Sequence, residues 1–163
     1  TSDQIICNVD LFATMVALTG VKPPEEAAPD SVNILPALTG NPQDSIRDHL
    51  VLAASKGGHL AMRQGDWVYI NAKGGGGFSG NKVGDHNLGG PAALQFTGET
   101  NSDVENSKFM PDAPKEQLYN LTIDLSQSEN TIHEHPEVAA RLRLLLRDIR
   151  SARAPKRPDL NTK

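Results

Sequence analysis

The residues from 58 to 70 constrain this chain most, because they predict a β-hairpin. Two runs rich in apolar and aromatic residues flank Gln64-Gly65, and a glycine there supplies the positive φ that a two-residue turn requires. Such a turn places Arg63 opposite Asp66 as an ion pair at the tip. One face then carries Leu60, Met62, Trp67 and Tyr69, and the other carries Ala61, Val68 and Ile70. Both faces are mostly apolar, so we expect both to be covered.

The composition limits what such a hairpin can belong to. The chain has 163 residues, of which 37% are hydrophobic and 4% aromatic, which is thin for a self-sufficient core. We therefore expect either long polar loops around a small core or a piece of a larger body, and the start inside a structured segment favours a fragment or a processed chain. The net charge of -4 argues against general nucleic-acid binding. The single cysteine excludes an intrachain disulfide framework and a multi-cysteine metal site.

Helical periodicity appears near both ends of the chain. Within residues 5–19, Leu11, Met15 and Leu18 fall at helical spacing in a wide apolar face, and we expect this helix to be largely buried. Residues 136–149 carry a second apolar stripe. Proline suits the first position of that helix because its missing N–H needs no partner there.

The middle of the chain predicts strands and one long connection. Apolar runs at 49–54 and 117–121 are typical of buried strands, whereas 73–114 is rich in glycine and polar residues and is expected to be a long loop. The four glycines at 74–77 do not form a phosphate-binding loop, because no lysine-serine pair and no helix follow them. We interpret them as part of a flexible surface loop.

Several short motifs follow one another in a recognisable order between residues 2 and 150. They are Asp10-Leu11-Phe12-Ala13-Thr14 before an apolar helix, Asp30-Ser31-Val32-Asn33-Ile34-Leu35-Pro36 with Gly40, Ala61-Met62-Arg63-Gln64-Gly65-Asp66-Trp67 with Tyr69-Ile70, Leu118-Tyr119-Asn120-Leu121 with Asp124, Glu129 and Asn130, and His135-Pro136-Glu137-Val138 with Leu142. Each motif alone is weak, but the ordered set resembles the C-terminal portion of a type I, arylsulfatase-like, formylglycine-dependent sulfatase.

The resemblance implies an α+β fold. Members of this family have an alkaline-phosphatase-like sulfatase fold. Its C-terminal subdomain is an antiparallel β-sheet of about four strands packed against a C-terminal helix. On this basis residues 1–48 are expected to form the edge of the large α/β domain and a connector. Residues 49–152 would form the sheet-and-helix subdomain with the long loop 73–114, and 153–163 a flexible tail.

The resemblance also implies a function for the protein to which such a portion belongs. The family hydrolyses sulfate esters of aryl or carbohydrate substrates, and this portion would brace the catalytic domain and shape the pocket rim. The expected partners are a catalytic N-terminal sulfatase domain or a second copy of this chain, and a sulfated carbohydrate is a further candidate. We expect the chain to bind neither nucleic acid nor a membrane. For the parent enzyme the family implies a periplasmic or secreted location.

The cofactors that the resemblance implies belong to that parent enzyme. The family uses a formylglycine, made within a Cys/Ser-x-Pro-x-Arg motif, and a calcium ion that orients the sulfate. Cys7 is followed by Asn8-Val9-Asp10, and the motif occurs nowhere in the chain. We therefore assign no catalytic and no metal-binding residue here, and we expect the chain alone to be inactive although it resembles part of a sulfuric ester hydrolase.

Three side chains are candidates for substrate binding: Lys56, His59 and His86. Lys56 and His59 flank two glycines at the head of the hairpin, where a lysine can contact an anion and a histidine can donate a hydrogen bond. His86 lies in the long loop beside Asp85 and would belong to a pocket rim. The alternatives are an exposed lysine in a turn, a histidine that merely starts a strand, and a solvated His-Asp pair.

A second hypothesis treats the chain as a stand-alone binding or assembly module without catalysis. Such a module would use the loop 73–114 and the arginine-rich end of the last helix, although a solvated helix face with cations near the helix C-terminus is the simpler explanation of those arginines. The apolar helix around Leu11 and Leu18 discriminates between the two hypotheses. A free-standing module must cover that helix itself, whereas a sulfatase portion leaves it exposed.

Overall fold

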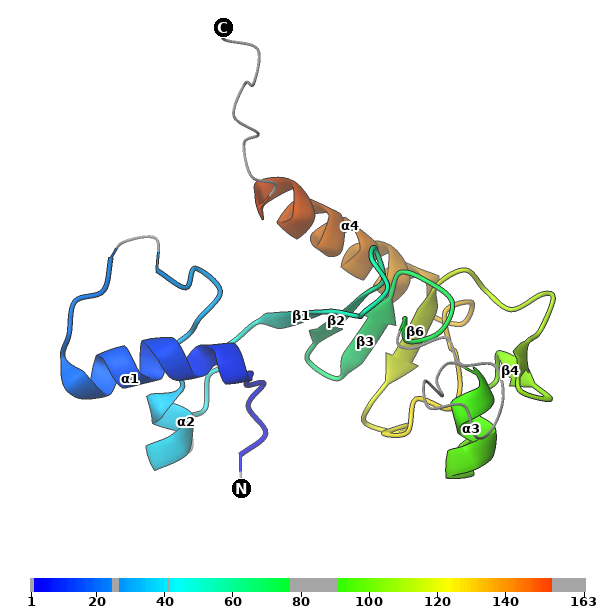
Figure 1. Cartoon of the computed structure of the whole chain (residues 1–163), viewed down its shortest axis with the longest axis horizontal. Coiled ribbons are helices and arrows are strands. Elements are labelled where there is room, and N and C mark those ends of the chain that lie inside the picture. The colour runs from blue at the N-terminus through cyan, green and yellow to red at the C-terminus, as the bar shows by residue number, and fades with distance from the viewer. Residues whose placement is uncertain (1, 25–26, 41, 77–90, 154–163) are drawn as a thin grey trace, which may run out of the picture. The chain divides into compact units, whose positions relative to one another are not determined.

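The computed structural model describes residues 2–24, 27–40, 42–76 and 91–153. The chain divides into two compact units: one comprises residues up to 50 together with 63–65, and the other comprises residues 51–62 and those from 66 onward. Figure 1 labels their elements. No described helix combines the length and the apolar character that crossing a membrane requires.

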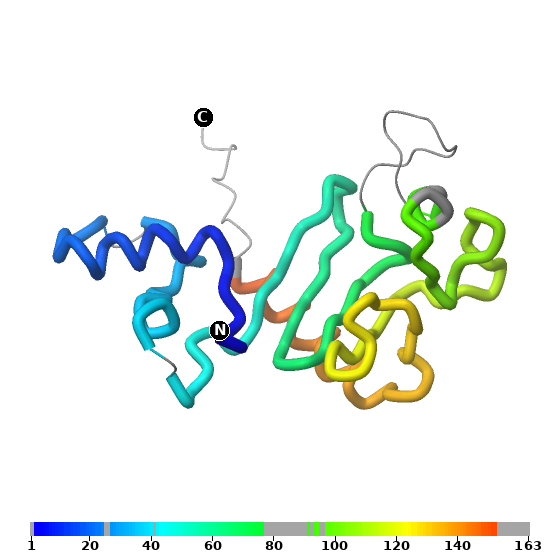
Figure 2. The backbone as a smooth tube through the Cα atoms, turned by 90° about the horizontal axis from the view of Figure 1, so that it is seen from below, coloured from blue at the N-terminus to red at the C-terminus, as the bar shows by residue number. Residues whose placement is uncertain are grey.

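A four-stranded sheet lies mostly in the second unit, and only the ends of β1 and β2 belong to the first. Its strands are β1 (His49–Ala53), β2 (Leu60–Gln64), β3 (Trp67–Ile70) and β6 (Gln117–Asn120), in the spatial order β1-β2-β3-β6. β3 and β6 run antiparallel, with Val68 opposite Tyr119 and Tyr69 opposite Leu118. Helix α4 (Pro136–Arg153) lies along one face of this sheet, and its orange-red segment crosses behind the strands in Figure 2. The α+β fold with an antiparallel sheet and a C-terminal helix is confirmed.

The predicted hairpin is confirmed, but its turn lies one residue later than predicted. β2 extends to Gln64, so the turn residues are Gly65, at a φ of 56°, and Asp66. Arg63, expected to pair with Asp66, instead donates from Nε to the carbonyl of Gly65 at 3.1 Å. The two faces keep their predicted residues, because shifting the turn by one residue moves each facing pair by two and so preserves the alternation.

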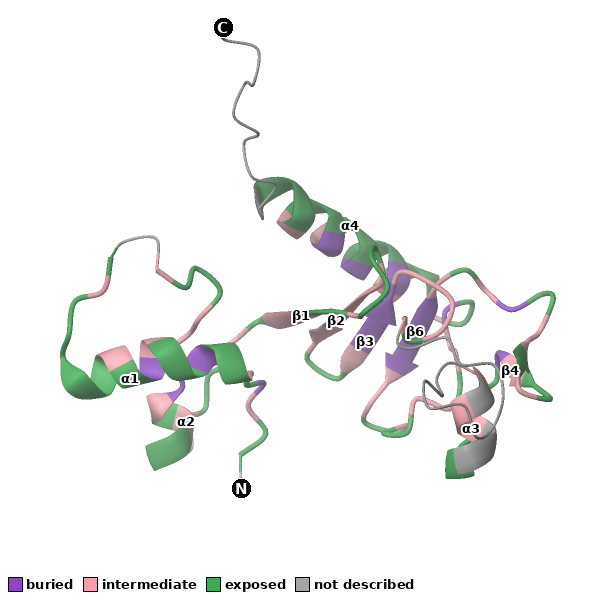
Figure 3. Ribbon diagram, in the orientation of Figure 1, coloured by how far each residue is buried: buried purple, intermediate pink, exposed green. Residues whose placement is uncertain are grey.

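The main core lies between the sheet and α4. Met62, Tyr69 and Leu118 of the sheet pack with Leu142 and Leu146 of the helix, and all five are at most 3% exposed. Burying five large side chains in one cluster is the main stabilising term for this unit, at about 1.5–3 kcal/mol per side chain. Figure 3 shows the buried residues on β3, β6 and the sheet-facing side of α4.

The first unit is held together by a buried carboxylate rather than by an apolar core. It contains a 3₁₀ turn (Asn8–Asp10), α1 (Leu11–Thr19) and α2 (Leu35–Thr39). Asp10 is fully buried and accepts hydrogen bonds from the N–H groups of Cys7 at 2.8 Å and Val32 at 3.0 Å, and it pairs with Arg47. Burial raises the pKa of the Asp10 carboxyl, but these donors outweigh it and hold the pKa below its usual range.

The expectation that the first helix is largely buried is wrong for this chain. Within α1 only Thr14 is buried, and Figure 3 shows most of the helix as exposed. Leu11, Phe12, Met15 and Leu18 are each between 43% and 56% exposed. The periodicity located the helix correctly, since it ends at Gly20 in the left-handed conformation, but it does not reveal whether the chain itself supplies the cover.

The segment expected to be one long loop contains regular structure in its described part. It includes α3 (Pro91–Thr97) and a small hairpin of β4 (Val104–Glu105) and β5 (Lys108–Phe109). These elements are too short to give a periodic signal, which explains why the sequence pattern missed them. Residues 77–90 and 154–163, which include most of the predicted loop's first half and the predicted tail, lie outside the described residues.

Candidate functional site

The loop that joins β1 to β2 positions two of the candidate residues. Ala54 donates its N–H to the carbonyl of His59 at 3.1 Å, and His59 donates its N–H to the carbonyl of Lys56 at 3.2 Å. These bonds close a tight loop that leaves Lys56 exposed and His59 half-buried. The structure therefore brings Lys56 and His59 together at the head of the hairpin, whereas His86 lies outside the described residues.

Asn71, which the sequence analysis did not single out, anchors the backbone on both sides of His59. Its Oδ1 accepts the N–H of Leu60 at 2.8 Å, and its Nδ2 donates to the carbonyl of Gly58 at 3.0 Å. The Asn71 N–H also donates to the carbonyl of Leu60 at 3.1 Å. Asparagine just after an apolar strand often bonds neighbouring backbone, and this signal would have identified Asn71 in the sequence.

The glycines at 74 and 76 allow two close contacts. Gly76 has a φ of 67°, and a Cβ placed there would lie 2.5 Å from the Cβ of His59. A Cβ at Gly74 would lie 2.7 Å from the ring of Phe109. Lys56 donates its N–H to the carbonyl of Gly76 at 2.8 Å, which ties the two loops together. These two glycines are therefore packing residues, and the earlier interpretation as a merely flexible loop does not describe them.

Two side chains among the described residues have a buried nitrogen without a hydrogen-bond partner: Arg47 at Nε and His59 at Nδ1. Arg47 is bonded through its other nitrogen Nη2 to Asp10 and Asp30, whereas no side-chain hydrogen bond is found for His59 among these residues. An unpartnered buried polar atom is uncommon in folded proteins and often marks a site completed by another group. This feature, beside the exposed Lys56, makes the loop at 54–59 the candidate substrate-contacting surface.

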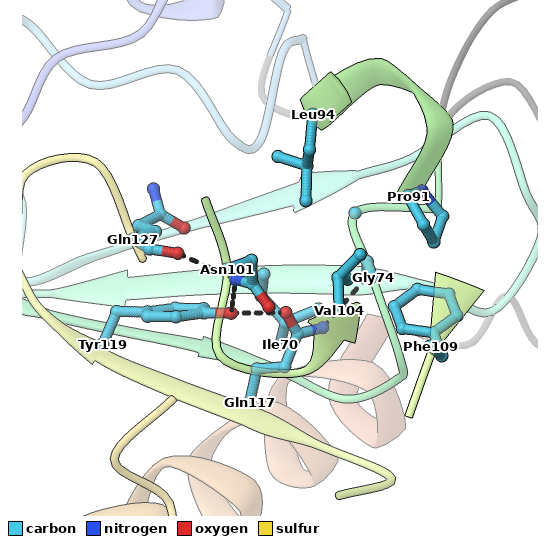
Figure 4. Close-up of a pocket in the computed structure, with 11 residues that line it drawn as sticks. Ile70, Gly74, Pro91, Leu94, Asn101, Val104, Phe109, Gln117, Tyr119 and Gln127 are labelled. Carbon is cyan, nitrogen blue, oxygen red and sulfur yellow. Dashed lines mark hydrogen bonds between the residues drawn. The ribbon is translucent and has the colours of Figure 1, made fainter. Parts of the chain in front are cut away.

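A cleft of about 380 Å³ lies on the sheet face opposite α4 (Figure 4). Its lining includes Ile70 of β3, Leu94 of α3, Phe109 of β5 and Tyr119 of β6. Apolar side chains thus contribute most of the walls, while several polar groups converge at its base. A cleft of this kind is a typical ligand site only where those polar groups are free to bind.

The polar groups in this cleft are already engaged with one another. The hydroxyl of Tyr119 donates to Oε1 of Gln117 at 2.6 Å and accepts from Nδ2 of Asn101 at 3.0 Å. Nε2 of Gln117 donates to the carbonyls of Ala72 at 2.5 Å and Gly74 at 3.1 Å. Burial raises the pKa of Tyr119 to about 12, so it remains a neutral donor. This network joins the strands to the 72–74 segment and has a structural role.

A second polar cluster lies on the α4 side of the sheet. Glu116 accepts from Nε of Arg143 at 3.1 Å on each oxygen, and it also accepts from the Tyr69 hydroxyl at 2.6 Å. The hydrogen bond from Arg143 holds the pKa of Glu116 below its usual range, even though burial opposes that effect. Burial and the neighbouring Glu116 carboxylate raise the pKa of Tyr69. The cluster fixes one guanidinium of α4 in place.

The described residues contain no group of three histidine, cysteine, aspartate or glutamate side chains arranged to hold a metal ion. The acidic side chains that are well bonded, such as Asp10 and Asp124, instead accept hydrogen bonds from backbone N–H groups. Those bonds organise turns and leave the carboxylates without a shared open site. The calcium ion and the formylglycine expected of the parent enzyme remain expectations about that enzyme.

No protein-family model matches the chain. A curated relative, the N-acetylgalactosamine-6-O-sulfatase of Bacteroides thetaiotaomicron, is 28% identical over 147 residues, which is 90% of this chain and 24% of that protein. A solved sulfatase structure described under the metabolism of multiple glycosaminoglycans by Bacteroides thetaiotaomicron is also 28% identical, with a TM-score of 0.53 over 87% of this chain and 24% of that one.

A further solved structure, a complex with its substrate D-glucosamine-2-N,6-O-disulfate, shares the fold with a TM-score of 0.58 at 18% identity. The similarity covers 99% of this chain and 27% of that one. The chain thus spans about a quarter of the length of the proteins it matches. These similarities confirm the resemblance that the ordered motifs indicated.

Proposed function

We propose that this chain, whose sequence and fold are those of a C-terminal sulfatase portion, works within a longer enzyme that hydrolyses a sulfate ester of a carbohydrate. Its role there is to brace the catalytic portion and to form part of the pocket rim. The named activity of the curated relative, which removes a 6-O-sulfate from N-acetylgalactosamine, supports a carbohydrate substrate. The exposed apolar surface of the first unit is the observation that carries the bracing role.

That surface is too apolar to be an ordinary solvated face. The side chains that are between 43% and 62% exposed in the first unit are Ile6, Val9, Leu11, Phe12, Met15, Leu18, Val21 and Leu38. A helix such as α1, which is apolar around most of its circumference, belongs in the interior of a larger body. Large exposed apolar patches mark protein interfaces, so the cover for this surface is the catalytic portion of the same enzyme.

The pocket-rim role belongs to Lys56 and His59. The ammonium of Lys56 is exposed and supplies a positive charge for a sulfate or another anionic group of the substrate. Asn71 holds the backbone on both sides of His59, and Gly76 packs closely against the His59 side chain. A side chain fixed in this way can donate a hydrogen bond to a sugar oxygen without first losing much conformational freedom.

The reaction itself depends on groups outside this chain. No Cys/Ser-x-Pro-x-Arg motif is present to supply a formylglycine, so the nucleophile and the calcium ligands come from the remainder of the enzyme. When bound, calcium would offset the negative charge of the sulfate. The residues of this chain contribute only binding, orientation and packing. Turnover therefore requires the longer protein.

Release of inorganic sulfate tests the proposal. N-acetylgalactosamine-6-sulfate is incubated with the longer protein that contains this chain and, separately, with the pure 163-residue chain. We expect sulfate release only from the longer protein, and a higher KM with a similar kcat after Lys56→Ala. Lys22→Ala, which removes another surface lysine, serves as the matched control. Sulfate release by the pure chain, or an inactive longer protein, would contradict the proposal.

Solution behaviour separates this proposal from the stand-alone module. Light scattering combined with a dye that binds apolar surfaces is applied to the pure chain. We expect self-association or strong dye binding, and we expect Phe12→Ser with Met15→Ser to reduce both. A monomer that binds no dye would favour the module instead, because its apolar helix would then have to be covered by the chain itself.

A further inference from the structure

A positively charged cleft lies between α4 and the sheet, on the side of the Tyr69 and Glu116 cluster. Its volume is about 590 Å³, and its lining includes Arg143, Arg147 and Arg150 of α4. These positions follow one another at intervals of four and three residues, which brings them to one side of a helix. Three guanidinium groups thus line one concavity of a chain whose net charge is -4.

The three arginines differ in how far their charges are neutralised. Arg143 is bound by both carboxylate oxygens of Glu116 and is fixed in orientation. Within the described residues the Arg147 side chain pairs with its neighbour Asp148, and both side chains are at least 65% exposed, so that pair is weak. The side chain of Arg150 forms no hydrogen bond or ion pair within the described part of the chain. The cleft therefore retains positive charge that Glu116 does not cancel.

The floor of the cleft supplies a different kind of contact. The apolar base consists of Leu144, which is 50% exposed, and of Leu146 and Tyr69, which are almost fully buried, so Leu144 supplies most of the apolar surface that a ligand can reach. Such a base beside guanidinium groups suits a sugar ring that carries a sulfate. The ring offers C–H groups to the base, and the sulfate oxygens accept paired N–H bonds from arginine.

We propose that this cleft binds a sulfated unit of an oligosaccharide, through Arg147 and Arg150 above an apolar base. The inference rests on the proposed function in one respect, namely that the enzyme acts on sulfated carbohydrates. The cleft would hold one sulfated unit of a glycan chain on α4, separately from the contacts that Lys56 and His59 make. It adds affinity for chains of several sulfated sugars and adds nothing to the binding of a single sugar that occupies the pocket rim.

Calorimetric titration of the 163-residue chain with a chondroitin 6-sulfate hexasaccharide tests the inference. The variants are Arg147→Gln and Arg150→Gln. Arg141→Gln is the matched control, because Arg141 is an exposed arginine of the same helix that does not line the cleft. Each cleft variant should weaken binding about three- to five-fold, as expected for exposed charge pairs. The control should bind as the unchanged chain does, and circular dichroism verifies that all three variants remain folded.

Three further ligands identify what the cleft recognises. The chemically desulfated hexasaccharide should not bind, and higher salt should weaken binding of the sulfated one. Inorganic sulfate, which lacks the sugar ring, should bind at least ten-fold more weakly than the hexasaccharide, whereas N-acetylgalactosamine-6-sulfate, which supplies one sulfated unit, should bind within a few-fold of it. Equal binding of inorganic sulfate would show a site for the free anion and would overturn the inference.

The remaining outcomes also decide the question. Equal binding by the unchanged chain and Arg150→Gln would overturn the inference, and so would an equal loss in Arg141→Gln. If the longer protein releases sulfate while the chain has no affinity for the hexasaccharide, the cleft assignment fails and the proposed function stands. If the chain binds with the expected arginine dependence while the longer protein releases no sulfate, the cleft stands as a sulfated-glycan site and the sulfatase proposal fails.

Discussion

Replacing Asp10 with alanine should unfold the first unit while leaving the sheet and α4 intact. The Asp10 carboxylate is fully buried and bonds two backbone N–H groups as well as Arg47, whose side chain is only 12% exposed. Removing one partner of a buried ion pair leaves an uncompensated charge and costs about 3–5 kcal/mol. The carbonyl of Asp30 still accepts from Arg47 at 2.9 Å, so we expect the lower end of that range.

The first unit has little else to offset such a loss. Its described buried apolar side chains are Ile5 and Ile34 alone, whereas the second unit buries the whole sheet-and-helix cluster. A loss of about 3 kcal/mol changes an opening equilibrium more than a hundred-fold. The protection of backbone amides in the first unit should therefore fall by at least that factor, or disappear.

Hydrogen exchange followed by mass spectrometry measures both units in one experiment. We expect faster exchange at the amides of Cys7 and Val32 in Asp10→Ala, and unchanged exchange in β3 and β6. Asp3→Ala is the matched control, because Asp3 is an exposed aspartate of the same unit. Unchanged protection at Val32 would refute the claim that the buried carboxylate organises this unit. An equal loss of protection in β3 would refute its independence from the sheet.

Three further predictions concern the second unit. Gly76→Ala should lower the free energy of unfolding of this unit by at least about 1–2 kcal/mol, because alanine disfavours a positive φ and its Cβ would collide with His59. Urea unfolding measures the change, and an unchanged midpoint would argue against the close contact. Leu142→Ala should cost about 2–5 kcal/mol and lower the melting temperature, because its side chain is fully buried; a shift of under 1 °C would contradict the described core. Arg143 lowers the pKa of the Glu116 carboxyl in the folded chain, so Glu116 contributes its full stabilisation above its unfolded pKa of about 4.5 and loses it as the pH falls below that value. In a plot of stability against pH, Glu116→Gln should therefore reduce the fall in stability at acid pH. An unchanged fall would exclude this role.

The hairpin shows how far local chemistry determines the fold. Alternation of apolar residues assigned Met62 and Tyr69 to one face and Val68 to the other, and the structure places them in two separate clusters accordingly. The turn was predicted one residue too early because Gly65, with its positive φ, can occupy either the second position of a Gln64-Gly65 turn or the first position of a Gly65-Asp66 turn. Only the pairing of whole strands selects between these two turns.

The candidate site was less accessible from sequence. Lys56 and His59 were identified because they flank two glycines before a strand, and the structure does bring them together. Asn71 and Gly76 could not be linked to His59, because the loop that carries Gly76 returns to the hairpin only in the folded chain. The charged cleft on α4 likewise needed coordinates, since spacing alone predicted a cationic face without showing that it lines a concavity.

The sequence by itself determined the strands of the main sheet, the helices near both ends of the chain, the alternating faces of the hairpin and, through its ordered motifs, the sulfatase resemblance. These features depend on neighbouring residues or on the order of short segments, and both can be read along a chain. The tertiary structure alone decided which apolar surfaces are covered. α1 is apolar around most of its circumference and α4 carries a single apolar stripe, yet it is the stripe of α4 that meets the sheet while the apolar side chains of α1 remain exposed. Burial depends on what lies opposite in space, which periodicity cannot encode.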